Sequence, residues 1–345
     1  MLALSYELSF EVLCLQAADQ GRGKVLFGDS YHRAVQETKP FLVGKEFPSV
    51  YLEFPLQGDP FLDVTALLKE LEPNTRIHSP AAKGTGPVLD WYAGIREKFD
   101  DISLGFELDT KKEQQTAAAV HFQPRRHTEL VRPFFDVVGE PERAGLYLDL
   151  DQRMPSGWPL SFFGMFRGRP ESPLRVCGYM DRDFQEACAN DSEKARKAFD
   201  EIGFTSYDDT MLSQISELLG TVPGNADFQF DVYDDGTLGP TFAIDAQFGI
   251  EQPEKVLASF TDGPGARVAR LLQEWGIADD RLRLGVQSTF ARALPMEREG
   301  DTLKLHTLTL MPQWAKVRWI NTQLQPAKLY CLANASPLDR KLSND

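Results

Sequence analysis

Tyrosine, basic and acidic side chains alternate with apolar ones in several short segments of this 345-residue chain. Side chains at alternate positions of a β-strand lie on the same face of the sheet, so we expect these polar residues to share one face. In a dry cavity, fixed charges stabilise a developing charge better than water does, tyrosine rings stabilise a nearby cation, and a carboxylate can accept a proton. The residues expected on this face are Tyr147, Tyr179, Tyr233, Tyr330, Arg175, Lys316, Arg318, Lys328, Glu107, Asp149, Asp151, Asp231 and Asp245.

Paired segments with a two-residue period supply the strands that would carry this face. The clearest pair is 228–233 with 241–248, which a turn at Asp235 and Gly236 separates. The other expected pairs are 5–15 with 51–56, 103–109 with 118–124, 145–151 with 174–180, and 303–311 with 315–320 across a turn at Pro312; a last strand begins at Ala327. Short separations of this kind predict antiparallel hairpins.

Helical patterns fill the intervals between the paired segments. They cover residues 63–71, 129–138, 192–202, 207–219, 253–260 and 266–275. The third pattern ends at Gly203, and the fourth has an acidic first turn and ends at Gly220, as helix termini prefer. Because hairpins rather than single strands alternate with these helices, and no glycine-rich loop follows a strand, a doubly wound parallel sheet is excluded. We expect one α+β domain over residues 1–345, built from repeated helix–hairpin units around a large antiparallel sheet.

The polar face of this sheet has two interpretations. A single antiparallel sheet commonly has one face in water, and the polar residues would then be ordinary surface. A sheet of about ten strands, however, tends to curl or to close into a barrel. Closure would turn the polar face into the wall of a lumen, to which tyrosine is suited because its ring is apolar and its tip polar. The predicted fold is therefore a closed barrel with helices outside, and the open sheet is the alternative.

Composition and charge narrow the classes of partner. The chain has 37 basic and 51 acidic residues, a net charge of −14, which disfavours nucleic acid and anionic lipid as partners. No apolar run approaches the roughly 18 residues that a membrane span needs, and the first residues lack the pattern of a signal peptide. The cysteines, none in a CxxC pair, are Cys14, Cys177, Cys188 and Cys331. Free thiols in this arrangement indicate a reducing cytoplasm.

Two further segments could contribute to a site. His121 and His127 lie six residues apart, a spacing that matches no zinc signature, so ordinary structural histidines are the favoured interpretation. Residues 162–170 combine phenylalanines, glycines and two arginines. This segment reads as a loop that either caps one end of the barrel or closes over it as a lid and supplies an arginine. No serine or cysteine nucleophile with a matching base stands out, so a hydrolase function is disfavoured because it would lack a nucleophile.

The expected architecture resembles the ABBA prenyltransferase barrel, in which repeated units of helices and antiparallel strand pairs close into a ten-stranded barrel. The resemblance rests on Lys316 and Arg318 in AKVRW, on Lys328 and Tyr330 in AKLY, and on the inward tyrosines. In that family, basic residues on barrel strands hold the prenyl diphosphate, and tyrosines shield the allyl cation. The aspartate-rich motif of the all-α prenyltransferases is absent from this sequence, which agrees with the barrel family.

The resemblance implies an enzyme that moves an allyl group from a prenyl diphosphate to a small aromatic molecule or a peptide side chain. Arg175, Lys316, Arg318 and Lys328 would hold the diphosphate, and Tyr147, Tyr179, Tyr233 and Tyr330 would line the path of the cation. Asp231 or Asp245 would take the proton from the acceptor, and Mg²⁺ could bridge carboxylates to the diphosphate. The alternative is a non-catalytic protein that binds a peptide or a partner through the same tyrosine-rich face.

Overall fold

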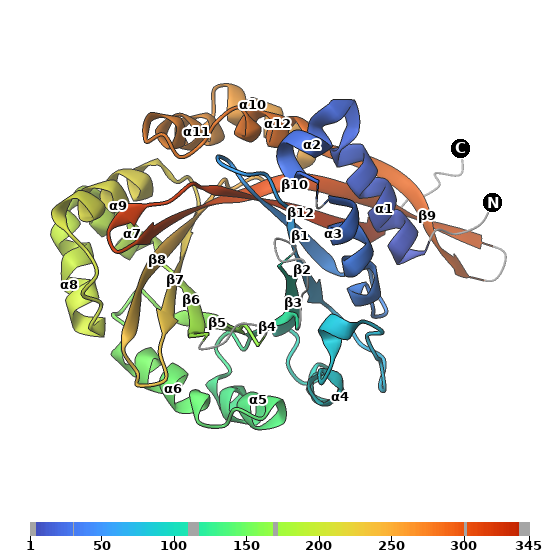
Figure 1. Ribbon diagram of the computed structural model, residues 1–345, viewed down its shortest axis with the longest axis horizontal. Helices are drawn as coiled ribbons and strands as arrows, with labels where there is room; N and C mark the ends of the chain where they lie inside the picture. Colours follow the sequence, from blue (N-terminus) through green and yellow to red (C-terminus); the bar gives the residue numbers. More distant parts are fainter. Residues whose placement is uncertain (1–4, 30, 110–116, 168–171, 300–301, 338–345) are drawn as a thin grey trace, which may run out of the picture.

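Ten antiparallel strands form a closed circuit in the computed structural model, which describes residues 5–29, 31–109, 117–167, 172–299 and 302–337 (Figure 1). The circuit runs β10-β12-β1-β2-β3-β4-β5-β6-β7-β8, and β8 pairs with β10 again. The strands are β1 (Ser49–Pro55), β2 (Asp63–Leu68), β3 (Ser103–Leu108), β4 (Ala119–Gln123), β5 (Leu160–Met165), β6 (Leu174–Tyr179), β7 (Ala226–Val232), β8 (Leu238–Gln247), β10 (Thr302–Ile320) and β12 (Lys328–Pro337). The predicted closed barrel is confirmed.

Helices surround the barrel on its outer side (Figure 1). They are α1 (Tyr6–Ala17), α2 (Arg22–Phe27), α3 (Tyr31–Thr38), α4 (Gly86–Ile95), α5 (Val131–Val138), α6 (Arg143–Arg153), α7 (Arg182–Asn190), α8 (Ser192–Ile202), α9 (Asp209–Thr221), α10 (Val256–Thr261), α11 (Pro264–Glu274) and α12 (Arg281–Gln287). Two further strands complete the sheet: β9 (Phe290–Glu299) pairs with the first half of β10, and the two-residue β11 (Gln323–Leu324) pairs with its end. Among the described residues, no helix is long and apolar enough to cross a bilayer.

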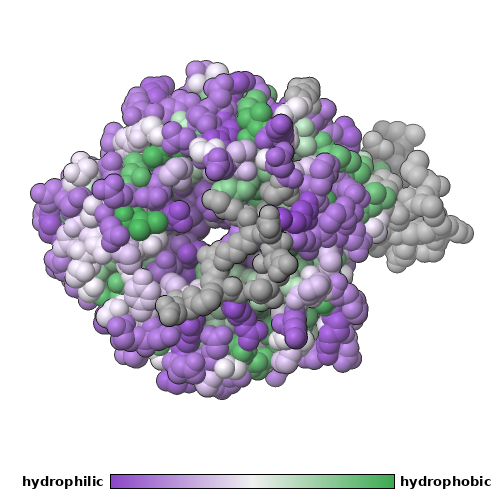
Figure 2. Space-filling model, in the orientation of Figure 1, coloured by the Kyte–Doolittle hydropathy of each residue, from purple (hydrophilic) through white to green (hydrophobic). Residues whose placement is uncertain are grey.

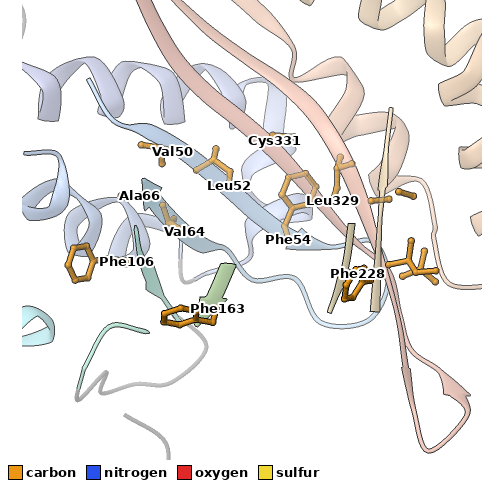
Figure 3. Close-up of a cluster of buried hydrophobic side chains, with 14 of the residues drawn as sticks. Val50, Leu52, Phe54, Val64, Ala66, Phe106, Phe163, Phe228, Leu329 and Cys331 are labelled. Atoms are coloured by element: carbon orange, nitrogen blue, oxygen red, sulfur yellow. The ribbon is translucent and has the colours of Figure 1, made fainter. Parts of the chain in front are cut away.

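The hydrophobic core lies between the strands and the helices. Strand residues of the apolar face meet helix residues there: Phe242 of β8 contacts Phe199 of α8 with ring centroids 5.0 Å apart, and Phe163 of β5 stacks on Phe135 of α5 at 4.8 Å. Figure 3 shows part of this layer, with Phe106, Phe163 and Phe228 among the buried side chains. Because one face of each strand packs outward in this way, the other face is left for the interior of the barrel.

The N-terminal segment is a helix, and the strand predicted over residues 5–15 is wrong. Ser5 caps α1, its side chain accepting a hydrogen bond from the backbone N–H of Leu8 at 3.3 Å. The buried residues Phe10, Leu13, Cys14 and Ala17 follow the three-to-four residue spacing of a helix face. Polar residues at alternate positions gave this segment a strand-like pattern, but its burial follows the helical period.

Two other predictions were wrong because a strand was predicted as a helix in one segment and a helix as a strand in the other. Residues 63–68, predicted as helix, form β2, in which Val64, Ala66 and Leu68 are buried alternately between β1 and β3. Residues 145–151, predicted as a strand, lie in α6, and β6 pairs instead with β5. Short apolar patterns fit both periods, so the pairing available in the sheet decides between them.

Strand β10 runs without a turn through Pro312, where a hairpin was predicted. The register against β12 shifts between Pro312, opposite Cys331, and Trp314, opposite Tyr330, so the proline lies at the start of a bulge that contains Gln313. Bulges accept the residue that cannot donate a backbone hydrogen bond. The second half of β10 closes the barrel against β8, which brings Lys316 and Arg318 into the circuit. The predicted pairs β3–β4 and β7–β8 are confirmed, as are the helices at α5, α8, α9 and α11.

Candidate active site in the barrel interior

The barrel encloses a cavity of about 1220 Å³. Each of the ten barrel strands contributes lining residues, and most of them are polar. Figure 2 shows the hollow near the middle of one face of the molecule, with hydrophilic residues around it. A volume of this size is sufficient for a drug-sized ligand and more, since such ligands occupy pockets of about 300–1,000 Å³. The polar face is therefore the wall of a lumen, and the open-sheet alternative is wrong.

The structure brings most of the predicted site residues to this cavity. Those that line it are Arg175, Tyr179, Asp245, Lys316, Arg318, Lys328 and Tyr330. Asp231 is on the same face of β7 as the lining residue Gln229, and its carboxylate is 3.1 Å from Nε of Arg175. The positions agree with the prediction because these residues lie on strands whose alternating pattern was assigned correctly.

Two predicted tyrosines lie elsewhere. Tyr147 is on α6, fully buried, with its ring 5.0 Å from Phe163 in the layer outside the barrel. Asp149 and Asp151 belong to the same helix, so the expectation that they line the lumen is also wrong. Tyr233 follows the end of β7, is 41% exposed, and does not line the cavity. Neither tyrosine is placed to shield a cation in the lumen.

A belt of paired charges crosses the wall of the cavity. Lys328 pairs with Glu53 and lies 3.8 Å from Asp63. On the neighbouring strand, Lys316 lies 3.6 Å from Asp245, and its Nζ also donates to Gln229 at 3.0 Å. Lys316 and Lys328 are themselves opposite each other in the β10–β12 register. Each lysine is therefore held by its own carboxylate, which reduces the repulsion between them.

Arg318 differs from the other cations of the belt. Among the described residues, no carboxylate lies within ion-pair distance of its guanidinium. Burial lowers the pKa of Arg318, and the nearby charge of Arg175 lowers it further. An arginine keeps its proton in such surroundings. The cavity thus contains a half-buried guanidinium that an anionic ligand could neutralise.

Aromatic rings cover the wall beside the lysines. Trp314 stacks on Tyr330 with centroids 5.0 Å apart and packs against Tyr51 at 4.8 Å. Nζ of Lys316 lies 4.9 Å from the centre of the Tyr330 ring. Burial raises the pKa of Tyr51 to about 12, and it raises that of Tyr330 above its ordinary value. Both phenols therefore remain neutral and present ring faces to a ligand.

Two carboxylates on β7 and β8 have pKa values above the ordinary value of an aspartate. Asp227 and Asp245 are opposite each other in the β7–β8 register, and both line the cavity. Burial, reinforced by the charge of Asp245, raises the pKa of Asp227 to about 7. Burial also raises the pKa of Asp245 to about 6, although Lys316 acts in the opposite direction. Carboxylates with these pKa values can exchange protons near neutral pH.

Three acidic residues of the site were missed in the sequence. Asp227 lies one residue before the segment that was taken as a strand, although its position continues the alternation of Gln229 and Asp231. Glu53 is in a correctly predicted strand whose two faces were not assigned, and Asp63 fell in a segment predicted as helix. Extending the alternation by one residue would have found Asp227.

We expect Asp227→Asn to gain stability relative to the wild type as the pH rises from about 4 to about 7, and the difference to stay level above that. The folded-state pKa of Asp227, about 7, is above its unfolded value, so rising pH costs the folded wild type stability in this interval. Asparagine does not titrate, and the groups acting on the site, Asp245, Arg125 and Lys316, are unchanged. Urea unfolding across this pH range measures the difference; a pH-independent difference would contradict the expectation.

Metal ligands are not grouped in the part of the chain that the structure describes: no three His, Cys, Asp or Glu side chains there could hold an ion together. His121 contacts Glu107 at 2.9 Å, and His127 contacts Asp101 at 2.8 Å, so the two histidines belong to separate pairs. The expected bridging Mg²⁺ would have to take most of its ligands from a diphosphate and water.

The segment predicted as a lid is partly a barrel strand. Residues up to Met165 form β5, where Phe162 lines the cavity. Arg167 donates to the backbone carbonyl of Val138 at 2.5 Å, so the described conformation directs it toward the end of α5. The remainder of the predicted lid, 168–170, lies outside the described residues.

Comparison with known proteins supports the fold assignment. No protein-family model and no curated protein matches the sequence. Among solved structures, the chain is similar to 5-dimethylallyltryptophan synthase from Streptomyces coelicolor, with a TM-score of 0.53, 14% identity, and coverage of 96% of this chain and 98% of the other. Prenyltransferase PriB gives a TM-score of 0.49 at 12% identity, with 96% of each chain covered. At these identities the likeness concerns the fold, and the predicted architectural resemblance to the ABBA-type aromatic prenyltransferases is confirmed.

Proposed function

We propose that this protein transfers an allyl group from a prenyl diphosphate to an aromatic acceptor inside the barrel. The observation that carries the proposal is the unpaired Arg318 beside the lysines and the aromatic wall of an enclosed cavity. An anion held there would lie next to ring faces that can stabilise a carbocation. The similarity of the fold to 5-dimethylallyltryptophan synthase makes dimethylallyl diphosphate and tryptophan the first substrates to test.

The diphosphate would bind to Arg318 and Lys316, with Arg175 nearby. Arg318 and Lys316 are two residues apart on β10, so they lie on the same face about 7 Å apart. When the bond between the allyl carbon and the diphosphate oxygen breaks, the electron pair stays on oxygen, and these fixed cations stabilise it. They are already in position, so the charge develops without reorganisation of solvent.

Tyr330, Trp314 and Tyr179 would cover the allyl cation after the bond breaks. Cation–π contacts with such rings contribute about 0.5–2 kcal/mol each when water is excluded. Because the Tyr330 phenol is neutral, its oxygen is a poor nucleophile toward the cation. The wall would thus protect the cation until the acceptor ring reacts with it.

Asp245 is suited to take the ring proton once the new carbon–carbon bond has formed. It lies beside Lys316, near the proposed leaving group, and its pKa of about 6 leaves it mostly ionised at neutral pH. Transfer of the ring proton to its carboxylate restores the aromatic acceptor. Asp231, the other predicted base, is paired with Arg175 and is therefore less available.

Thermal unfolding with dimethylallyl diphosphate tests the binding step, and mass analysis of tryptophan incubated with it tests the transfer. A ligand at 100 times its Kd adds about 2.7 kcal/mol of stability, which gives a clear rise in the melting temperature. Stabilisation and an acceptor heavier by one prenyl unit are expected. The absence of stabilisation by dimethylallyl, geranyl and farnesyl diphosphates, with and without Mg²⁺, would overturn the proposal.

The binding-protein alternative depended on an open sheet with a shallow groove. Closure of the barrel removes that groove and places Tyr330 and Arg318 inside a cavity. A peptide could still enter as an acceptor by inserting one side chain, so peptides with a terminal tryptophan belong in the acceptor panel.

A further inference from the structure

The cavity wall has more acidic than basic side chains. Eight carboxylates and six lysines or arginines are among the described residues that line it, so part of the wall favours a cationic group of a ligand. The ion pairs account for part of the excess, because Glu53, Asp63 and Asp245 each lie close to a lysine. Two more carboxylates of the wall contact histidines: Glu107 lies 2.9 Å from His121, and Asp101 lies 2.8 Å from His127.

Asp227 is the clearest case of a carboxylate without a cation. Its Oδ2 accepts a hydrogen bond from Gln247 at 2.9 Å, and no lysine or arginine of the described residues lies within ion-pair distance of it. Asp245, directly across the β7–β8 register, adds a second negative charge, and like charges at opposing strand positions repel. Oδ1 of Asp245 is buried, accepts no hydrogen bond from the described residues, and lies 3.6 Å from Nζ of Lys316. This arrangement costs stability unless a ligand completes it.

The surroundings of Asp227 fit a flat ligand with a polar end. Tyr179 is opposite Asp227 in the β6–β7 register, and Trp314 is opposite Gln247 in the β8–β10 register. Aromatic walls beside a carboxylate are the surroundings in which a protonated amine is stabilised from two sides.

We propose that the aromatic acceptor carries a protonated amine and that Asp227 holds it; this deepens the proposed function and rests on it. Asp227, Asp245 and Lys316 follow one another across β7, β8 and β10. Adjacent strands are about 4.8 Å apart, which separates the amine site from the diphosphate site by about 10 Å. An arylalkylamine spans that distance with its ring over Asp245, the proposed base. The ammonium supplies the positively charged donor that Asp227 lacks, and Asp245 keeps its contact with Lys316.

Calorimetric titration of the full chain at pH 7.5, without diphosphate, tests this assignment with three probes: tryptamine, tryptophan and indole-3-propionate. Tryptamine should bind at least tenfold more tightly than indole-3-propionate, which has the same ring and a negative end. Asp227→Asn should reduce the affinity for tryptamine at least tenfold and leave the affinity for dimethylallyl diphosphate within about twofold. Asp136→Asn, the same change on the exposed face of α5, is the matched control and should change neither.

Equal or tighter binding of indole-3-propionate would overturn the amine assignment, as would an unchanged preference in Asp227→Asn. If that variant did not fold, the comparison of the three probes on the wild type would still decide. The proposed function is tested independently of the amine site. If the protein binds the amine but does not respond to any prenyl diphosphate, the proposed transferase activity is refuted and the amine site stands. Prenyl transfer to acceptors without an amine, at equal kcat/KM, refutes the amine site alone.

Discussion

Replacing Arg318 by alanine should reduce the rate of transfer by about 100-fold or more, the effect of removing one preorganised donor from a developing anion, and should weaken the binding of dimethylallyl diphosphate. Arg318 is a cavity cation for which the described residues provide no ion pair, and it lies two residues from Lys316 on β10, so its charge is available to the ligand. Lys316 and Arg175 are partly neutralised by Asp245 and Asp231, and they cannot replace it.

The same substitution should leave the melting temperature unchanged or raise it, because it removes a half-buried charge whose partial desolvation opposes folding. Isothermal titration with the diphosphate and a melting curve on the same sample measure both effects. Arg132→Ala, on the exposed face of α5, is the matched control. An Arg318→Ala protein with wild-type diphosphate affinity would contradict the proposed site, and a large loss of stability would show that Arg318 is structural.

Lys328→Met should destabilise the fold by about 3–5 kcal/mol, the usual cost of removing one partner from a buried ion pair. Lys328 is next to Glu53 and Asp63, and both carboxylates are nearly inaccessible to water. Lys328 lowers the pKa of Glu53, whereas burial and the charge of Glu53 raise that of Asp63. Without the lysine, Glu53 must either remain charged without its partner or take up a proton.

Urea unfolding at neutral pH measures this loss. The double variant Lys328→Met with Glu53→Gln should recover most of it, since the remaining polar groups are then uncharged or protonated. A similar loss in the single and double variants would mean that packing of the lysine stem, and not its charge, stabilises this part of the wall. If the single variant lost less than about 1 kcal/mol of unfolding free energy, the Lys328–Glu53 pair would contribute no more than a surface ion pair does.

The sequence was most informative where local chemistry and tertiary structure agree. The α8 helix has the predicted bounds because Asp191 caps its start and Gly203, at a φ of 81°, ends it. The β7–β8 hairpin follows from its turn residues and from the alternation on both sides. The strand prediction for residues 145–151 was wrong because the sequence GLYLDLD fits a helix as well as a strand. Only the pairing of β5 with β6 excludes this segment from the sheet.

For the site, alternation predicted which side chains face inward on β6, β8, β10 and β12, and this was sufficient for Arg318 and Tyr330. The alternation could not predict which charged side chains form ion pairs with each other. The contact of Lys328 with Glu53 joins residues 275 positions apart, and it depends on a register between strands that no single segment contains. The distinction between a paired lysine and an unpaired Arg318 therefore required the structure.

The position of β12 between β1 and β10 also affects how the chain reaches this structure. The first barrel strand finds one of its two neighbours only among the last residues described, and such distant pairings slow folding. During synthesis, nine strands would precede the tenth, and β1 would present an unpaired edge for most of that time. Unpaired edges are sites of aggregation. Recovery of the protein in soluble form should therefore depend on how quickly the final strand is inserted, and truncation before β12 should lead to aggregation.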